Sequence, residues 1–172
     1  CWDEIYHIIL KEFNMSKDDL EYEDSFVSNI YAQYNLTETE LEDMQTPLIK
    51  NNLNPHLDSA ISATLWLNTY DECKGGTAFY KNIKYNSIDI FDIKDYSNYS
   101  KIRDEYVNGI NDDWEMIEIL PMKYNRLSIY HAARFHNPYI EDMWFKDYYR
   151  ISQQFFFNIE RDRLYKTFKR WK

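Results

Sequence analysis

Short strand-like runs recur through this chain and constrain its fold more than any other feature. About seven or eight short strands are expected, from runs that combine alternating or β-branched apolar residues with turn signals at their ends. No internal repeat or linker divides the chain. The pattern favours an antiparallel β-sandwich or jelly roll, braced by helices, over a parallel sheet with alternating helices. The expected strands include Phe26–Tyr34, Ile61–Leu67, Thr77–Tyr80, Trp114–Leu120, Arg126–Tyr130 and Arg150–Ile159.

Helices are expected at both ends of the chain and within one insertion. The segment Trp2–Phe13 carries isoleucines at helical spacing behind two acids in its first turn. Leu36–Asn54 is expected to be a long surface loop. The insertion Tyr85–Asp113 is rich in Asn and Asp, and apolar spacing predicts a short helix in Tyr99–Ile110. We expect this insertion to cover one face or the mouth of a pocket, and the basic tail Arg161–Lys172 to form a closing helix.

Length, charge and cysteine content narrow the classes of function. At 172 residues, with 18% aromatics, the chain is expected to form a single domain over residues 1–172. A net charge of −9 opposes binding to a nucleic-acid polymer. Cys1 and Cys73 lie in no paired spacing, which argues against a disulfide framework. Apolar runs fall short of the ~20 residues of a membrane-spanning helix and no signal segment opens the chain, so a cytoplasmic location without membrane partners is expected.

The candidate chemistry centres on His56 and Asp58. Two residues apart, their side chains project from the same face of an extended segment, which suits a pair of metal ligands. A third ligand would complete a two-His-one-carboxylate triad, which leaves positions on iron(II) open. We favour His136, just before the turn signal Asn137-Pro138, as this ligand. His131 stays as the alternative, because spacing does not separate two histidines five residues apart.

A basic residue opens the clearest of the predicted strands. Arg150 and Ser152 lie two apart and therefore share a strand face. A guanidinium group binds a carboxylate through two parallel hydrogen bonds, and a neighbouring hydroxyl can add a third. The pair is our candidate anchor for a dicarboxylate, with Arg126 and Arg134 as rival anchors.

The order of these groups along the chain resembles the iron(II)/2-oxoglutarate-dependent dioxygenase superfamily. His-x-Asp comes first, a distal His follows, and Arg-x-Ser comes last. Between them, Leu65–Asn68 (LWLN) and Gly75–Phe79 (GGTAF) are similar to the Leu-Asn, Gly-Gly and Thr-x-Phe pattern of the prolyl-hydroxylase-like branch. The resemblance covers Asn54–Phe157. It implies a mainly β fold of the double-stranded β-helix (jelly roll) type.

The resemblance also implies a mechanism and a set of roles. His56, Asp58 and His136 would bind Fe(II), and Arg150 with Ser152 would bind the far carboxylate of the co-substrate 2-oxoglutarate. O2 would then oxidise the substrate while 2-oxoglutarate is decarboxylated. The carboxylate ligand favours hydroxylation, because halogenating relatives lack it. The prolyl-hydroxylase-like branch commonly has Lys at the anchor, so the Arg here leaves the substrate open among a small molecule, an amino acid and a peptide.

Four further residues are candidate pocket residues: Trp66, Tyr80, Tyr130 and His131. Two other functions remain alternatives at this point. One is a catalytically inactive jelly-roll module that binds a ligand or a partner protein. The other is an oxygenase of the same fold that does not use 2-oxoglutarate. Formation of succinate separates both from the first hypothesis.

Overall fold

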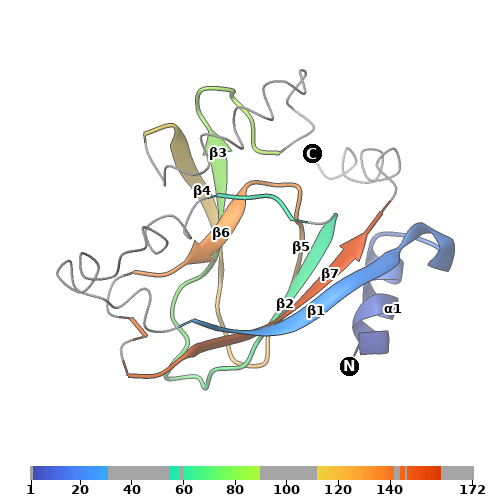
Figure 1. Cartoon of the computed structure of the whole chain (residues 1–172), viewed down its shortest axis with the longest axis horizontal. Helices are drawn as coiled ribbons and strands as arrows, with labels where there is room; N and C mark the ends of the chain where they lie inside the picture. The colour runs from blue at the N-terminus through green and yellow to red at the C-terminus, as the bar shows by residue number, and fades with distance from the viewer. Residues whose placement is uncertain are drawn as a thin grey trace, which may run out of the picture.

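Two antiparallel β-sheets are the main elements of the protein (Figure 1). The computed structural model describes residues 2–30, 55–58, 60–89, 112–141, 144–145 and 147–159. The strand order is β1-β7-β2-β5 in one sheet and β4-β3-β6 in the other, which confirms the expected mainly β class. The elements in chain order are α1 (Trp2–Glu12), the 3-10 helix η1 (Lys17–Asp19), β1 (Glu21–Ile30), β2 (Ile61–Trp66), β3 (Gly76–Asn82), β4 (Trp114–Pro121), β5 (Leu127–His131), β6 (His136–Tyr139) and β7 (Arg150–Asn158).

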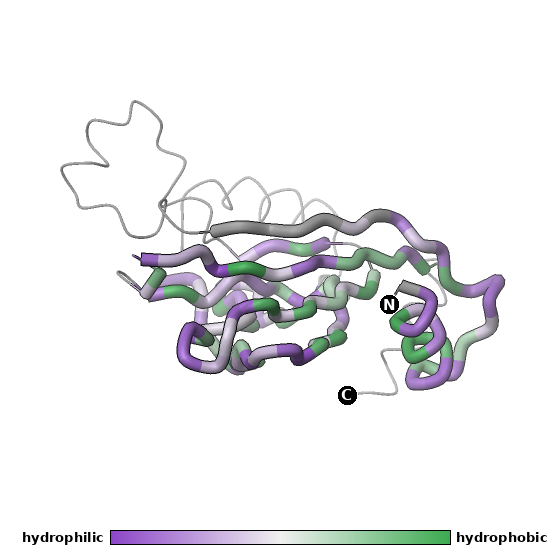
Figure 2. The backbone as a smooth tube through the Cα atoms, turned by 90° about the horizontal axis from the view of Figure 1, so that it is seen from below, coloured by the Kyte–Doolittle hydropathy of each residue, from purple (hydrophilic) through white to green (hydrophobic). Residues whose placement is uncertain are grey.

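Helix α1 covers one face of the four-stranded sheet (Figure 1). The helix buries Ile5 and Ile9, while its polar residues stay in solvent, so its tube in Figure 2 shows both apolar and polar segments. Each fully buried side chain of this size stabilises the fold by about 1.5–3 kcal/mol. The strand residues in this cluster alternate along their strands, as a period of two requires. They include Ile61 and Ala63 of β2 and Phe155 and Phe157 of β7.

The opposite face of the same sheet carries buried polar side chains next to aromatic ones. Thr64 of β2 and Arg150 and Ser152 of β7 project there, and each is at most 2% exposed. The alternation that directs apolar residues toward α1 directs these polar ones to the other side of the sheet. Burial of polar groups costs free energy unless they are hydrogen-bonded. This face is therefore suited to a binding site rather than to core packing.

Two glycines allow the three-stranded sheet to assemble around β3. Gly75 has a φ of +68° and Gly76 a φ of +155°, values that favour glycine. A Cβ atom at Gly75 would lie 2.0 Å from the carbonyl oxygen of Tyr139, and one at Gly76 would lie 2.0 Å from that of Leu120. The backbones of both flanking strands thus approach β3 too closely for any side chain. The predicted Gly-Gly turn lets β4 and β6 pair on either side of β3.

Two expectations from the sequence are wrong: where the first strand begins, and the turn at Asn137-Pro138. The first strand begins at Glu21, five residues before the expected Phe26, because β1 pairs with nearly the whole length of β7. The expected turn at Asn137-Pro138 lies within β6. Proline is tolerated there because β6 is at the end of its ladder. The backbone N–H and C=O of His136 face His56 rather than β3. Pro138 lies two residues further along β6, so its nitrogen also faces away from β3 and no ladder hydrogen bond is lost.

The expected N-terminal helix is present, and the other two expected helices lie outside the described residues. The same is true of the expected loop Leu36–Asn54 and of most of the insertion Tyr85–Asp113. No helix in the described part of the chain is long and apolar enough to cross a bilayer.

Candidate metal centre

His56, Asp58 and His136 lie together although 78 residues separate the last two. Their ligand-capable atoms all lie within 4.8 Å of one another. The Nε2 atom of His136 is 3.1 Å from Oδ2 of Asp58, and Nε2 of His56 is 3.7 Å from the same oxygen. Within the described ranges, this triad is the one cluster of three His, Cys or acidic side chains that could hold a metal ion.

Backbone pairing brings the triad together. His56 and His136 exchange two backbone hydrogen bonds, of 2.8 and 3.0 Å, and the N–H of Asp58 donates to the carbonyl of Ala132 at 3.0 Å. The extended segment 55–58 therefore runs beside the start of β6. Because His56 and Asp58 are two residues apart, both side chains project from one side of that segment, where the ring of His136 reaches them.

The protonation of the triad suits metal binding. Nδ1 of His136 is 2.8 Å from the carbonyl oxygen of Arg134. A carbonyl oxygen only accepts, so Nδ1 carries a proton. Nε2, which shares a hydrogen bond with Asp58, is the nitrogen that would exchange its proton for a metal. Burial raises the pKa of Asp58, but the hydrogen bond and charge of His136 and the charge of His56 outweigh it, so the pKa is lowered. Asp58 is therefore an anion in this setting.

The spacing of the triad fits a divalent metal ion. Bonds of about 2.0–2.2 Å at right angles to one another separate ligand atoms by about 3 Å. The two observed contacts with Asp58, at 3.1 and 3.7 Å, are close to that value. Two imidazoles and one carboxylate suit iron(II) and leave coordination positions open. The side chains of His56 and Asp58 are 26% and 27% exposed, so small molecules can reach the centre.

A cavity of about 190 Å³ connects the triad with Arg150. This volume is below the roughly 300–1,000 Å³ of pockets for drug-sized ligands, so it suits a small polar molecule. Besides the triad, the cavity is lined by Thr64, Thr77, Tyr130, Asn137, Pro138, Arg150, Gln154 and Phe156.

Arg150 brings a buried positive charge to this cavity. Its side chain is held on two sides: Nη2 donates to the carbonyl of Gly76 at 3.1 Å, and the guanidinium lies 4.7 Å from the centre of the Trp66 ring. At 2% exposure the group is removed from bulk water. In the protein interior, opposite charges attract more strongly than they do at the surface. The geometry suits binding of an anion such as a carboxylate.

The two rival arginines lie elsewhere. Arg134 pairs with Glu118 at 3.5 Å, and Nη1 of Arg126 donates to the carbonyl of Pro121 at 3.2 Å. Neither side chain is among those that line the 190 Å³ cavity. Of the three candidates, the structure brings Arg150 to the cavity that the triad lines.

A family of unknown function (DUF6445) matches residues 13–147 of the chain. The protein belongs to this family. The matched residues include His56, Asp58 and His136 and end before Arg150. A comparison with curated proteins gives no match. The chemistry of this DUF6445 protein must therefore be inferred from the site itself.

Tyr130 is the predicted pocket residue that lines the cavity of this DUF6445 protein. Burial and the nearby charge of Asp58 raise its pKa, while hydrogen bonds with Thr64 and Thr77 act in the opposite direction. The net shift keeps the phenol neutral. Tyr130 can therefore donate a hydrogen bond to an anion in the cavity.

Two predicted residues support the cavity rather than line it. Trp66 packs beneath the guanidinium of Arg150. Ser152 lies on the same face of β7 as Arg150, but its hydroxyl accepts a hydrogen bond of 2.9 Å from Gln154. Gln154 in turn accepts one of 2.7 Å from Thr64 and is itself part of the cavity wall. Gln154 and Thr64 therefore line the cavity at the position where Ser152 was expected.

The two other predicted pocket residues project away from the triad. His131 follows Tyr130 on β5 and so points to the opposite face of the strand, where it lines a different cavity. Tyr80 packs in a cluster with Ala78 and Phe135, because alternation along β3 puts Tyr80 on the face opposite to Thr77, which lines the cavity. Neither side chain is among the described residues that line the 190 Å³ cavity.

Asn68 is a residue whose role the sequence reasoning missed. It is 2% exposed, and its amide contacts the backbone on both sides of Arg150. Oδ1 accepts a hydrogen bond of 2.6 Å from the N–H of Ile151, and Nδ2 donates one of 2.7 Å to the carbonyl of Tyr149. The Leu-Trp-Leu-Asn motif contains this residue, but its contacts are about 80 residues away in the sequence.

Proposed function

We propose that this DUF6445 protein is an iron(II)- and 2-oxoglutarate-dependent oxygenase that hydroxylates a small molecule, an amino acid or a peptide. One observation carries the proposal: a two-His-one-carboxylate triad and a buried arginine line the same small cavity. The proposal includes the double-stranded β-helix as the fold. Two antiparallel sheets, with the His56 segment paired to β6, support that assignment.

The proposed overall reaction balances with O2 and 2-oxoglutarate as co-reactants. One oxygen atom enters a C–H bond of the substrate, the other enters succinate, and CO2 leaves. Two of the four electrons that reduce O2 come from the oxidative decarboxylation of 2-oxoglutarate, and the other two come from the C–H bond of the substrate. Iron(II) held by the triad would supply the redox chemistry that couples these two oxidations.

The residues of the chain bind and orient the reactants. His56, Asp58 and His136 would hold the metal, and the carbonyl of Arg134 keeps the proton of His136 on Nδ1. Arg150 would bind the far carboxylate of 2-oxoglutarate through charge-assisted hydrogen bonds.

Hydroxyl groups and one ring complete the proposed co-substrate site. The neutral phenol of Tyr130 would donate to the same carboxylate, and Thr77 holds that phenol by a hydrogen bond. Trp66 shields one face of the Arg150 guanidinium from water.

The direct test is to add iron(II) and then 2-oxoglutarate to the protein without oxygen. We expect a visible metal-to-ligand charge-transfer band that requires both additions, and succinate after oxygen is admitted. A protein that shows neither at saturating iron(II) would be a binding module without this activity. Substrate oxidation without succinate would indicate an oxygenase that does not use 2-oxoglutarate.

Replacing Asn68 with alanine should weaken 2-oxoglutarate binding while it leaves iron(II) binding nearly unchanged. The amide fixes the backbone on both sides of Arg150, so its loss would misplace the guanidinium. We expect roughly a tenfold higher KM for 2-oxoglutarate, in line with the cost of losing partners that orient a ligand group.

Asn68→Asp is the matched control for that variant, because a carboxylate keeps the acceptor for Ile151 and loses the donor to Tyr149. Partial recovery of the KM in this variant would support a positioning role. Equal losses of iron(II) and 2-oxoglutarate affinity in the alanine variant would instead indicate general unfolding of the site.

A further inference from the structure

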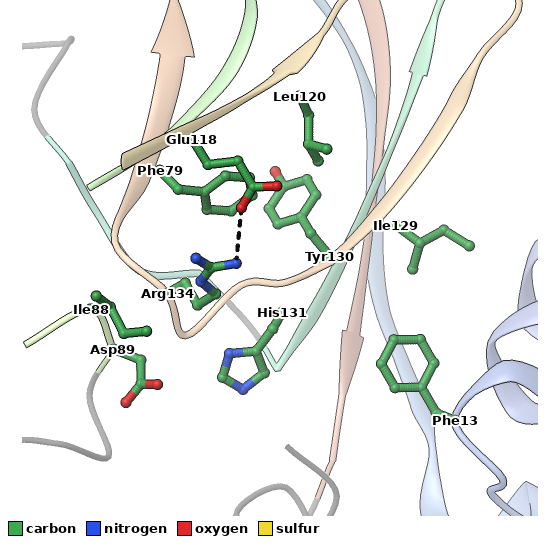
Figure 3. A pocket seen from close by; sticks show the side chains of 10 residues that line it. All are labelled: Phe13, Phe79, Ile88, Asp89, Glu118, Leu120, Ile129, Tyr130, His131 and Arg134. Carbon is green, nitrogen blue, oxygen red and sulfur yellow. Dashed lines mark ion pairs between the residues drawn. The ribbon is translucent and has the colours of Figure 1, made fainter. Parts of the chain in front are cut away.

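Figure 3 shows the side chains that line a second and larger cavity, of about 530 Å³. This cavity shares Tyr130 with the cavity of the candidate metal centre. Its walls come from β3, β4 and β5, from the turns that follow β3 and β5, and from Phe13 after α1. The volume falls within the range of about 300–1,000 Å³ that is typical of pockets for small organic ligands. The cavity is lined by Phe13, Phe79, Ile88, Asp89, Glu118, Leu120, Ile129, Tyr130, His131 and Arg134.

Aromatic rings lie at the border between this cavity and the triad. Tyr130 lines both cavities. Its ring centre lies 5.0 Å from that of His136 and 5.4 Å from that of Phe79, which is itself 6.2 Å from the ring of His136. A ligand in the larger cavity would therefore lie next to the metal centre.

Backbone contacts hold the charged end of the cavity next to the triad. Asp89 and Arg134 form an antiparallel bridge, and the N–H of Phe135 donates to the carbonyl of Ile88 at 3.1 Å. The backbone carbonyl of Arg134 also accepts the hydrogen bond from Nδ1 of His136. The turn that orients a candidate metal ligand is thus part of the wall of the larger cavity.

The charges of the cavity favour a cation. Two carboxylates, Asp89 and Glu118, and one guanidinium, Arg134, line it, so with His131 neutral its formal charge is −1. Arg134 lies 3.5 Å from Glu118 and 4.7 Å from the centre of the Phe79 ring (Figure 3). The net charge of −9 on the whole chain adds to the negative potential.

The remaining surface of the cavity is apolar. Ile88, Leu120 and Ile129 are aliphatic, and the rings of Phe13 and Tyr130 also contribute. Such a surface favours a ligand with a hydrophobic body, and aromatic faces also attract an ammonium group. Charge and shape together therefore select an amphipathic cation.

We infer that this cavity binds a small organic ammonium ion with an aromatic or branched aliphatic body, and that this amine is the substrate. The assignment as substrate rests on the proposed oxygenase function. The binding itself depends only on the cavity, so the two can fail separately.

Calorimetry with the full chain tests the binding, with 2-phenylethylammonium as the probe. Its matched controls are 2-phenylethanol, which is neutral, and 3-phenylpropionate, which is an anion of similar size. We expect the ammonium to bind at least tenfold more tightly than either control. Failure of the ammonium to bind, or equal binding of a control, would overturn the inference.

A charge-neutral replacement locates the binding. Glu118→Gln should weaken binding of the ammonium about tenfold, because it removes one of the two carboxylates. The side chain of Glu118 is 51% exposed, so the variant should fold. Glu115→Gln is the control, because it removes the same charge from an exposed residue of β4 outside the cavity. Equal weakening in both variants would show a general charge effect and would contradict the assigned site.

Two further measurements separate this inference from the proposed function. His56→Ala should lose iron(II) binding and keep ammonium binding, because His56 does not line the larger cavity. In the wild type, the amine should raise the rate of succinate formation severalfold. If the protein binds the amine but forms no succinate, the proposed oxygenase function is contradicted and the inference about the cavity stands. Succinate formation that the bound amine leaves unchanged would overturn its assignment as substrate.

Discussion

Replacing Asp58 with alanine should abolish the charge-transfer band with iron(II) and 2-oxoglutarate and lower succinate formation by more than about 100-fold. Changes to residues that merely support a metal ligand already cost about 10–100-fold, and Asp58 would be a ligand itself. It is the one carboxylate of the triad, and its anion lies within 3.1–3.7 Å of both imidazoles. Without it, two neutral nitrogen ligands remain, which bind a divalent ion weakly.

Two variants control for effects on folding. Asp71→Ala removes an exposed carboxylate from the turn before β3 and should keep the band. Asp58→Asn keeps the shape of the side chain and loses its charge, so it should also lose most iron(II) affinity. A band of wild-type intensity in Asp58→Ala, with the thermal unfolding temperature unchanged, would show that the triad does not hold the iron.

Replacing Arg150 with alanine should weaken 2-oxoglutarate binding by at least about 30-fold and change iron(II) affinity only slightly. Removal of one partner from a buried, hydrogen-bonded charge pair costs about 2–5 kcal/mol, and about 1.4 kcal/mol corresponds to a factor of ten. The guanidinium of Arg150 is held over Trp66 and lines the cavity without being part of the triad. Titration of the charge-transfer band with 2-oxoglutarate measures this loss.

The nature of the anchor sets the controls for this variant. Arg150→Lys should recover part of the affinity, because it restores the charge but not the paired hydrogen bonds of a guanidinium. Arg126→Ala, at a rival anchor outside the cavity, should bind 2-oxoglutarate normally. If Arg150→Ala weakens iron(II) binding more than it weakens 2-oxoglutarate binding, the co-substrate carboxylate binds elsewhere.

The choice between His136 and His131 as the third ligand shows which additional fact the sequence pattern needed. Both are possible ligands by spacing, yet Leu127 and Ile129 pack toward α1, and His131 continues their face of β5. Strand alternation would have excluded His131 once that face was recognised as the one that meets the helix. The missing information was which sheet face α1 covers.

Other residues depended on contacts that no local pattern contains. Asn68 holds the backbone on both sides of Arg150, and Gln154 with Thr64 forms the cavity wall assigned to Ser152. The position of β6 at the end of its ladder makes Pro138 acceptable in a strand. Each of these facts is a relation between segments that are distant in the chain.

The sequence by itself determined the strands and the residue types of the candidate site. Alternation of side chains is a local property of an extended backbone, so the five strands from β2 onward other than β6 could be located to within about two residues. The tertiary structure decided which side chains meet. Pairing of residue 56 with β6 and of β7 with β2 places the triad and Arg150 at one cavity. Such pairing depends on long-range hydrogen bonds and packing, which short sequence patterns do not encode.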